Sequence, residues 1–251
     1  MMKLDSLIEE AYNVFSHYTI SSRLDVCKVC CITDEEEKIL TRTPLRELNE
    51  NQLSNYICSA RCYSNKEQLE MCYFLPRILE MVSQNIYPTI SSETLFDRLF
   101  DDNNTFIGTE SEHCFLNTFF LHYWINYINH YPQQEPVQDI LVMIGRHFNI
   151  DPLLKQWTKS KSTASVLHFV DLMINKDYKQ ISSYPNVQME SRIDIWLKKA
   201  DTQMHFMAEI ENVYMNDGYL GLNSYKNDYW LKVDIEVAYT TYMNIDTGFH
   251  T

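Results

Sequence analysis

The stretch RLDVCKVCCITDEEEKILTRTPLRELNENQLSNY, from Arg23 to Tyr56, decides the fold. It places an acidic helix start directly after a cluster of cysteines. Thr33 or Asp34 can cap a short helix that runs to Leu40, and the acids that follow suit the positive end of the helix dipole. The stretch therefore predicts closely spaced helices joined by short connections.

Further helix starts follow along the chain. Thr43-Pro44 has the pattern of an N-cap followed by proline at the first helical position, and Asn49 or Asn51 begins the next helix. Thr109 and Glu112 have the spacing of a capping box. Asp151 is expected to cap a helix that begins at Pro152. Apolar residues at helical spacing predict further helices over residues 4–17, 65–82 with a kink or restart at Pro76, 92–100, 109–130, 136–147, 152–158, 163–175, 193–197 and 204–214.

Composition also favours an all-α fold. Only five glycines and seven prolines occur in 251 residues, which is few for the turns of an all-β protein. We expect a single domain over residues 1–251, with a sub-boundary near 182–187 and about ten packed, mostly antiparallel helices. Residues 218–242 are ambiguous: β-branched and aromatic residues favour a strand at Val233 to Ala238, whereas the lack of a partner strand favours a helix from Asn223. We expect the helix.

Charge limits the classes of partner. The chain carries 34 acidic and 21 basic residues, for a net charge of −13. Such a field repels nucleic acid and anionic membrane surfaces and attracts basic proteins, although acidic surfaces also serve solubility. The first residues lack the pattern of a secretory signal, and the seven cysteines are odd in number and unevenly placed. We therefore expect a cytoplasmic protein with no nucleic-acid or membrane partner.

Few residues suggest chemistry. The sequence has no nucleophile elbow, glycine-rich phosphate loop or HExxH pattern, so we predict no enzyme, no cofactor and no catalytic residue. Cys27, Cys30, Cys58 and Cys62 have spacings that could hold zinc. Free cysteine is, however, commonly buried in protein cores, and that interpretation is preferred for these residues. No metal ligand is therefore predicted.

Three motifs resemble those of a widespread bacterial family of helical proteins. They are R-L-x-x-C-x-x-C-C from Arg23 to Cys31, T-P-L-R-E-L from Thr43 to Leu48, and F-L-P-R-I-L-E from Phe74 to Glu80. Some members of the family are encoded beside polymorphic or contact-dependent toxins, which implies an immunity role. The chain departs from the family at ICSARCYSNKEQLEMCY, where relatives carry a small-residue helix with a tryptophan. The resemblance implies no catalytic residue.

The leading functional prediction is an immunity protein that neutralises a cognate toxin, expected to be a basic nuclease, by stoichiometric binding. A zinc-stabilised helical enzyme or regulatory module that uses the Cys27–Cys31 cluster is the alternative, and a helical scaffold for an unrelated basic partner is a third. Acidic clusters interleaved with tyrosines have the composition of an interface for a basic protein. The predicted partner-binding residues are Glu35, Glu36, Glu37, Glu93, Asp97, Asp101, Asp102, Glu110, Glu112, Glu209 and Glu211.

Overall fold

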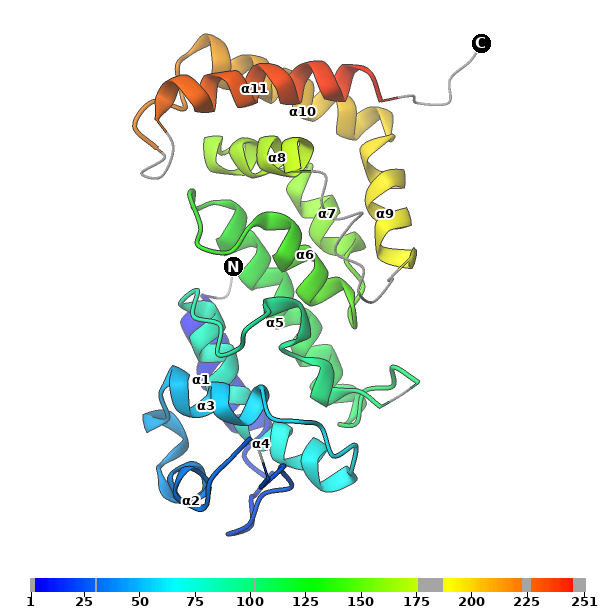
Figure 1. The fold of residues 1–251 in the computed structure, drawn as a ribbon. Coiled ribbons are helices and arrows are strands. Elements are labelled where there is room, and N and C mark those ends of the chain that lie inside the picture. Colours follow the sequence, from blue (N-terminus) through cyan, green and yellow to red (C-terminus); the bar gives the residue numbers. More distant parts are fainter. Residues whose placement is uncertain (1–2, 30, 102, 176–186, 223–226, 246–251) are drawn as a thin grey trace. The chain divides into compact units, whose positions relative to one another are not determined.

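The computed structural model describes residues 3–29, 31–101, 103–175, 187–222 and 227–245. These residues form eleven α-helices and three short 3-10 helices (Figure 1). Within the described ranges the only β-type pairing is one isolated bridge between Phe100 and Phe106. The prediction of an all-α fold is confirmed.

No helix within those ranges is both long enough and apolar enough to cross a membrane.

The chain divides into two compact units, Met1–His122 and Tyr123–Thr251, which we call the N-terminal and C-terminal units. The N-terminal unit contains α1 (Leu4–Val14), α2 (Asp34–Arg42), η1 (Leu45–Glu47), α3 (Glu50–Ile57), α4 (Asn65–Ser83), η2 (Ser92–Thr94), η3 (Asp97–Leu99) and the first part of α5 (Glu110–Ile128). The C-terminal unit contains the rest of α5 with α6 (Val137–Gly145), α7 (Asp151–Trp157), α8 (Thr163–Asn175), α9 (Val187–Leu197), α10 (Ala200–Met215) and α11 (Asp228–Met243). The predicted single domain stays a prediction, and most of the predicted sub-boundary near 182–187 lies outside the described residues.

Side-chain caps begin several helices where the sequence predicts them. The Thr33 side chain accepts a hydrogen bond from the Glu36 amide, while the Glu36 carboxylate accepts one from the Thr33 amide. Asn49 and Gln52 form the same reciprocal pair at the start of α3. Each pair satisfies amides that the helix itself cannot reach, which fixes the first helical residue.

Three local predictions are wrong. Residues 92–100 form the two short 3-10 helices η2 and η3 instead of one α-helix, because residues 95, 96 and 98–100 are all buried and one helix face cannot bury them together. Thr43-Pro44 leads only into the single turn η1. Asp151 is the first residue of α7, and Ile150 is its N-cap. Helix α4 continues through Pro76.

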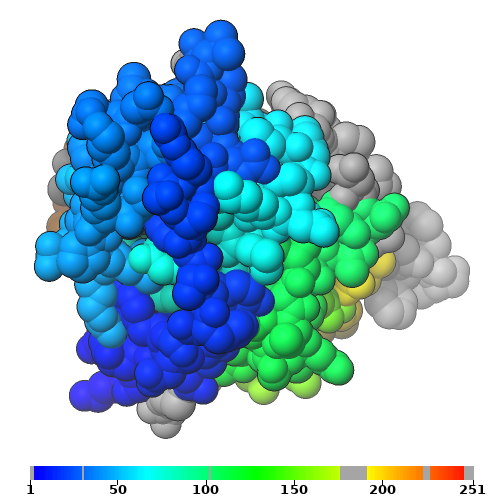
Figure 2. Space-filling view, turned by 90° about the horizontal axis from the view of Figure 1, so that it is seen from below, coloured from blue at the N-terminus to red at the C-terminus, as the bar shows by residue number. Residues whose placement is uncertain are grey.

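The core of the N-terminal unit joins α1 to α4. Leu7 and Ala11 of α1 and its C-cap residue Phe15 are buried, as are Phe74 and Ile78 of α4. The connection between α1 and α2 crosses this unit as a long non-helical segment. In Figure 2 it is the dark blue band between the lighter blue residues of α2 and α3 and the cyan residues of α4. Because that connection has few backbone hydrogen bonds of its own, side chains must hold it in place.

The core of the C-terminal unit is aromatic. The Trp157 ring lies 5.2 Å from Trp124 and 5.3 Å from Trp196, measured between ring centroids. Phe169 of α8 stacks on Phe206 of α10 at 3.8 Å and meets Tyr242 of α11 at 4.9 Å. Helices α10 and α11 therefore cover α8, as Figure 1 shows.

The ambiguity at residues 218–242 is resolved in favour of a helix. Residues 228–243 form α11, and the Asn227 side chain caps it by accepting a hydrogen bond from the Trp230 amide. The predicted start at Asn223 lies outside the described residues. Leu231, Ile235, Ala238 and Tyr242 are buried at helical spacing, so packing against α8 overrides the β-propensity of the segment.

His168 is the most deeply buried histidine of the aromatic core. It is 2 % exposed, its ring stacks on Tyr127, and its Nε2 lies 2.9 Å from the carbonyl oxygen of His130. Burial lowers the pKa of this imidazole to about 4. The folded protein therefore holds His168 neutral, and the unfolded chain binds a proton more readily below its ordinary pKa of about 6.5.

Acidification is expected to destabilise the protein through this histidine. Because the folded pKa lies below the unfolded one, stability is present above about pH 6.5 and is lost as the pH falls towards 4. We expect a loss of about 1 kcal/mol between about pH 7 and pH 5.5 that is absent from His168→Phe. This loss of unfolding free energy is measured by urea unfolding monitored by tryptophan fluorescence, since all four tryptophans lie in the C-terminal unit. Equal pH slopes for both proteins would contradict the assignment.

Candidate interaction surface

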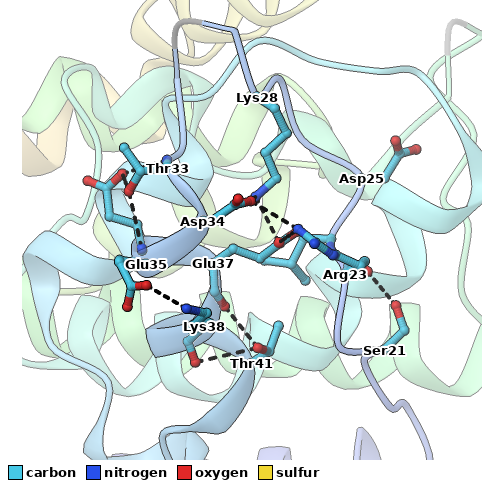
Figure 3. A network of polar contacts seen from close by, with 12 residues as sticks. Ser21, Arg23, Asp25, Lys28, Thr33, Asp34, Glu35, Glu37, Lys38 and Thr41 are labelled. Atoms are coloured by element: carbon cyan, nitrogen blue, oxygen red, sulfur yellow. Dashed lines mark hydrogen bonds and ion pairs between the residues drawn. The ribbon is translucent and has the colours of Figure 1, made fainter.

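The motif from Arg23 to Cys31 holds the connection between α1 and α2 in place. The buried Glu37 carboxylate of α2 accepts hydrogen bonds from the Leu24 amide at 2.7 Å and from Arg23 at 2.9 Å. Lys28 lies 2.8 Å from the same carboxylate, and Figure 3 shows both cations beside Asp34 and Glu37. Although burial opposes ionisation, the hydrogen bonds from Lys28 and Leu24 lower the pKa of Glu37. The charged residues here serve the fold.

A second buried carboxylate anchors the same connection to α4. Glu70 is 2 % exposed, and its two oxygens lie 3.1 and 3.0 Å from the amide of Asp25. Burial raises the pKa of Glu70 to about 7, against the opposing effect of the Asp25 amide. Glu37 and Glu70 therefore bind successive backbone amides of one loop from two different helices.

The other two motifs meet at α1. Arg46 of the T-P-L-R-E-L motif forms two hydrogen bonds to Glu9, of 2.8 and 2.7 Å, and its guanidinium lies 3.7 Å from the centroid of the Tyr12 ring. The Tyr12 hydroxyl donates to Glu80 of the F-L-P-R-I-L-E motif at 2.7 Å, and Arg77 pairs with the same carboxylate. All three motifs thus join helices, and most of their charged residues, Arg23, Arg46, Arg77 and Glu80 among them, already have partners.

The most buried ion pair of the described residues joins Glu67 to Arg98. Glu67 is fully buried and Arg98 is 3 % exposed. The Glu67 carboxylate also accepts from the Cys62 and Tyr63 amides at 3.1 and 2.8 Å. Arg98 donates to the carbonyl of Ser59 and to that of Ile57. These polar groups satisfy one another and leave no open cleft for a substrate between them.

Two of the predicted partner-binding acids lie in the interior. Glu37 and Glu112 are each 2 % exposed. Glu112 accepts from the Thr109 amide at 2.6 Å and from the Tyr18 hydroxyl at 3.0 Å. The capping box predicted at Thr109 is therefore confirmed, and the same contacts keep Glu112 from a partner. A carboxylate that caps a helix or holds a loop is not available to a partner. Its clustering with other acids in the sequence had predicted an exposed position.

The remaining predicted acids differ in their surroundings. Asp101 is exposed, but hydrogen bonds from the backbone of Thr105 and Asn103 lower its pKa and make it part of its own loop. Glu36 caps α2. Asp102 lies outside the described residues. The others are exposed or half-buried, and they are divided between the N-terminal unit and the C-terminal unit: Glu35, Glu93, Asp97 and Glu110 in the first, Glu209 and Glu211 in the second.

Cys58, Cys62, Cys72 and Cys114 are free thiols. Cys27 and Cys31 are half-buried, and Cys58 and Cys62 are exposed, so the expectation that Cys58 is a core residue is wrong. Cys58 ends α3 as its C-cap, which places it at the surface. Among the described residues, no three His, Cys, Asp or Glu side chains lie close enough together to hold a metal ion, and Cys30 is not described.

Glu211 belongs to a groove between α10 and α11, the two outermost helices of the C-terminal unit. The Tyr239 hydroxyl donates to Glu211, and the Tyr214 hydroxyl donates to Glu236 at 2.6 Å. These hydrogen bonds raise the pKa of both tyrosines, so the phenols stay protonated. We call this site the Tyr–Glu groove. It has a volume of about 550 Å³ and is lined by Ile210, Glu211, Tyr214, Met215, Ile235, Glu236, Tyr239 and Thr240.

Exposed apolar side chains are frequent on and beside the two helices of the groove. Met215 is 77 % exposed and Trp230 is 55 % exposed. Eight of the fourteen strongly exposed large apolar side chains among the described residues lie in the last 48 positions of the chain, and together with the groove we call them the α10–α11 outer face. They are Met204, Met215, Leu220, Leu222, Tyr229, Trp230, Val237 and Met243. Two neighbouring helices that carry several exposed apolar side chains are a candidate interaction surface.

The charged residues of helices α10 and α11 are mostly acidic. Each carries three acids, and Lys232 is their only lysine or arginine. The Lys232 amine lies 5.0 Å from the centroid of the Tyr214 ring, at the side of the groove. Sequence reasoning selected Glu209 and Glu211 here but missed Glu236, Trp230 and the methionines. The signal that could have found them is the presence of apolar residues on both faces of α11.

Comparison with known proteins gives no match to this chain among family models, curated proteins or solved structures. The family resemblance of the three motifs stays a prediction.

Proposed function

We propose that this protein neutralises a basic protein by stoichiometric binding through the α10–α11 outer face. The partner class that fits the motif resemblance is a bacterial toxin, and the charge favours a nuclease. The observation that carries the proposal is the Tyr–Glu groove, whose lining includes the exposed Met215, on two helices that carry further exposed apolar side chains. Apolar anchors beside polar groups are the usual composition of a protein interface.

The charge of the face supports a basic occupant. The Glu211 and Glu236 carboxylates lie at the groove, each fixed in place by a tyrosine hydroxyl. Nucleases bind nucleic acid through Lys and Arg side chains that contact phosphates. A carboxylate held at the right distance can pair with those same cations, and the net charge of −13 accelerates the encounter. Binding would then mask the surface that the toxin needs.

The experiment is a titration against the product of the neighbouring gene. The purified partner is assayed for nuclease activity while this protein is added in increasing amounts. We expect activity to fall linearly and to reach its minimum at one equivalent per partner. Loss of activity at far below one equivalent would show turnover and refute stoichiometric binding. Undiminished activity in the presence of excess protein would refute neutralisation itself.

A further inference from the structure

A second cavity of the C-terminal unit carries the opposite charge. It lies between α7, α9 and the start of α10 and has a volume of about 770 Å³. Its lining includes Lys155, Lys159, Arg192 and Lys199, and we call it the basic pocket. Ligand pockets commonly measure about 300–1,000 Å³, so this cavity can hold a nucleotide-sized molecule. Its residues do not overlap those of the Tyr–Glu groove.

The cations of the pocket exceed its anions. Arg192 is paired with Asp151 and donates to Asn149 at 2.9 Å. Lys155, Lys159 and Lys199 form no ion pair with any other residue that the structure describes. Asp201 is the remaining acid in the lining. The chain has a net charge of −13, yet three lysines line this one cavity. The acids in the lining do not balance the positive charge of the cavity.

Helix α10 begins at this cavity and adds to its positive potential. Lys199 is the N-cap of the 16-residue helix, and its side chain makes no capping hydrogen bond. The Thr202 amide is satisfied by the Asp201 carboxylate at 3.0 Å. The dipole of a long helix favours an anion near its N-terminus, so the helix start acts in the same direction as the lysines.

One wall of the pocket is apolar and rigid. Trp196 stacks on Trp157 with ring centroids 5.3 Å apart, and its indole nitrogen donates to Thr158 at 2.8 Å. Ile195, at the preceding position of α9, is 60 % exposed and lines the cavity with Leu154. A ligand that fits this lining needs an anionic group for the lysines and an organic ring for the wall.

We propose that the basic pocket binds a small phosphorylated molecule of the nucleotide class. The phosphates lie against Lys155, Lys159 and Lys199 at the start of α10. The organic ring lies against Ile195 and Leu154. This inference is independent of the proposed partner binding, because no residue of the Tyr–Glu groove takes part in it.

Calorimetry with the full-length protein tests the proposal, using ATP, adenosine and an unrelated dicarboxylate, succinate, as probes. ATP is expected to bind with one site per chain, and adenosine and succinate to bind at least tenfold more weakly. Lys155→Ala/Lys159→Ala is expected to weaken ATP binding at least tenfold. Lys161→Ala/Lys198→Ala removes the same charge outside the pocket lining and is expected to leave the ATP affinity unchanged.

Three results would overturn the proposed binding of a nucleotide in the basic pocket. ATP that fails to bind at millimolar concentration would show that the pocket takes no nucleotide. Equal weakening in both double variants would show that ATP responds only to overall charge. Adenosine binding as tightly as ATP would show that the lysines do not hold the phosphates. Far-UV circular dichroism of each variant confirms that these exposed substitutions leave the helices intact.

Discussion

The Glu67→Gln variant is expected to lose about 3–5 kcal/mol of unfolding free energy, because breaking one partner of a buried ion pair leaves the other charge uncompensated. Arg98 is 3 % exposed and cannot turn to water without leaving the carbonyls of Ser59 and Ile57. Glutamine keeps the size of the side chain, so the loss measures charge and hydrogen bonding, not a cavity. The effect is read as a lower urea midpoint by far-UV circular dichroism.

Glu35→Gln is the matched control, because it removes the same charge from an exposed position. Glu35 pairs only with Lys38 on the surface of α2, where an ion pair contributes about 0–1 kcal/mol. A Glu67→Gln midpoint as close to the wild type as that of Glu35→Gln would show that the buried pair is not needed for the fold. Arg98→Met in the Glu67→Gln background removes the orphaned charge and is expected to recover part of the stability.

Helices could be predicted because their starts depend on local chemistry. The Thr33–Glu36 and Asn49–Gln52 pairs satisfy amides within one helical turn, so four residues of sequence contain the whole signal. Residues 92–100 also carry a helical spacing, yet Arg98 must reach Glu67, which lies 31 positions away. A contact at that separation cannot be seen in a local pattern, and it replaces the α-helix with two 3-10 turns.

The surroundings of the predicted acids could not be read from the sequence for a related reason. Clustering in the sequence identifies carboxylates but not what they contact. Glu37 lies among four consecutive acids, yet it turns inward to the Leu24 amide while Glu35 faces solvent. Glu112 forms the capping box of α5 with Thr109 and accepts from Tyr18, which lies in the connection after α1. Only the placement of a distant loop decides which carboxylate of a run is buried.

The α10–α11 outer face could not be predicted from the sequence, for a different reason. Leu231, Ile235 and Tyr242 are buried, whereas Trp230 and Val237 are exposed on the same helix. With apolar residues on both sides, α11 has little amphipathic character, so its pattern does not reveal which side faces α8. The aromatic core of the C-terminal unit settles the question by drawing Tyr242 onto Phe169.

The double variant Glu211→Lys/Glu236→Lys is expected to weaken binding of the basic partner about 100-fold, or about 2.7 kcal/mol. Charge reversal replaces two favourable pairs by repulsion, and it breaks the hydrogen bonds from Tyr239 and Tyr214 that position the groove. Stopped-flow association with the product of the neighbouring gene is expected to show a lower on-rate and a weaker dependence on salt. The thermal unfolding midpoint should change little, because Glu211 and Glu236 are exposed.

A matched control separates the contribution of the groove to binding from that of the electrostatic field of the whole protein. Glu10→Lys/Glu47→Lys makes the same change in net charge at two exposed positions of the N-terminal unit. If only long-range attraction matters, both double variants slow association equally. If the groove is the contact, only Glu211→Lys/Glu236→Lys raises the dissociation rate. Unchanged affinity in that variant, together with weaker binding by Asp97→Lys/Asp101→Lys, would move the interface to the acids of the N-terminal unit.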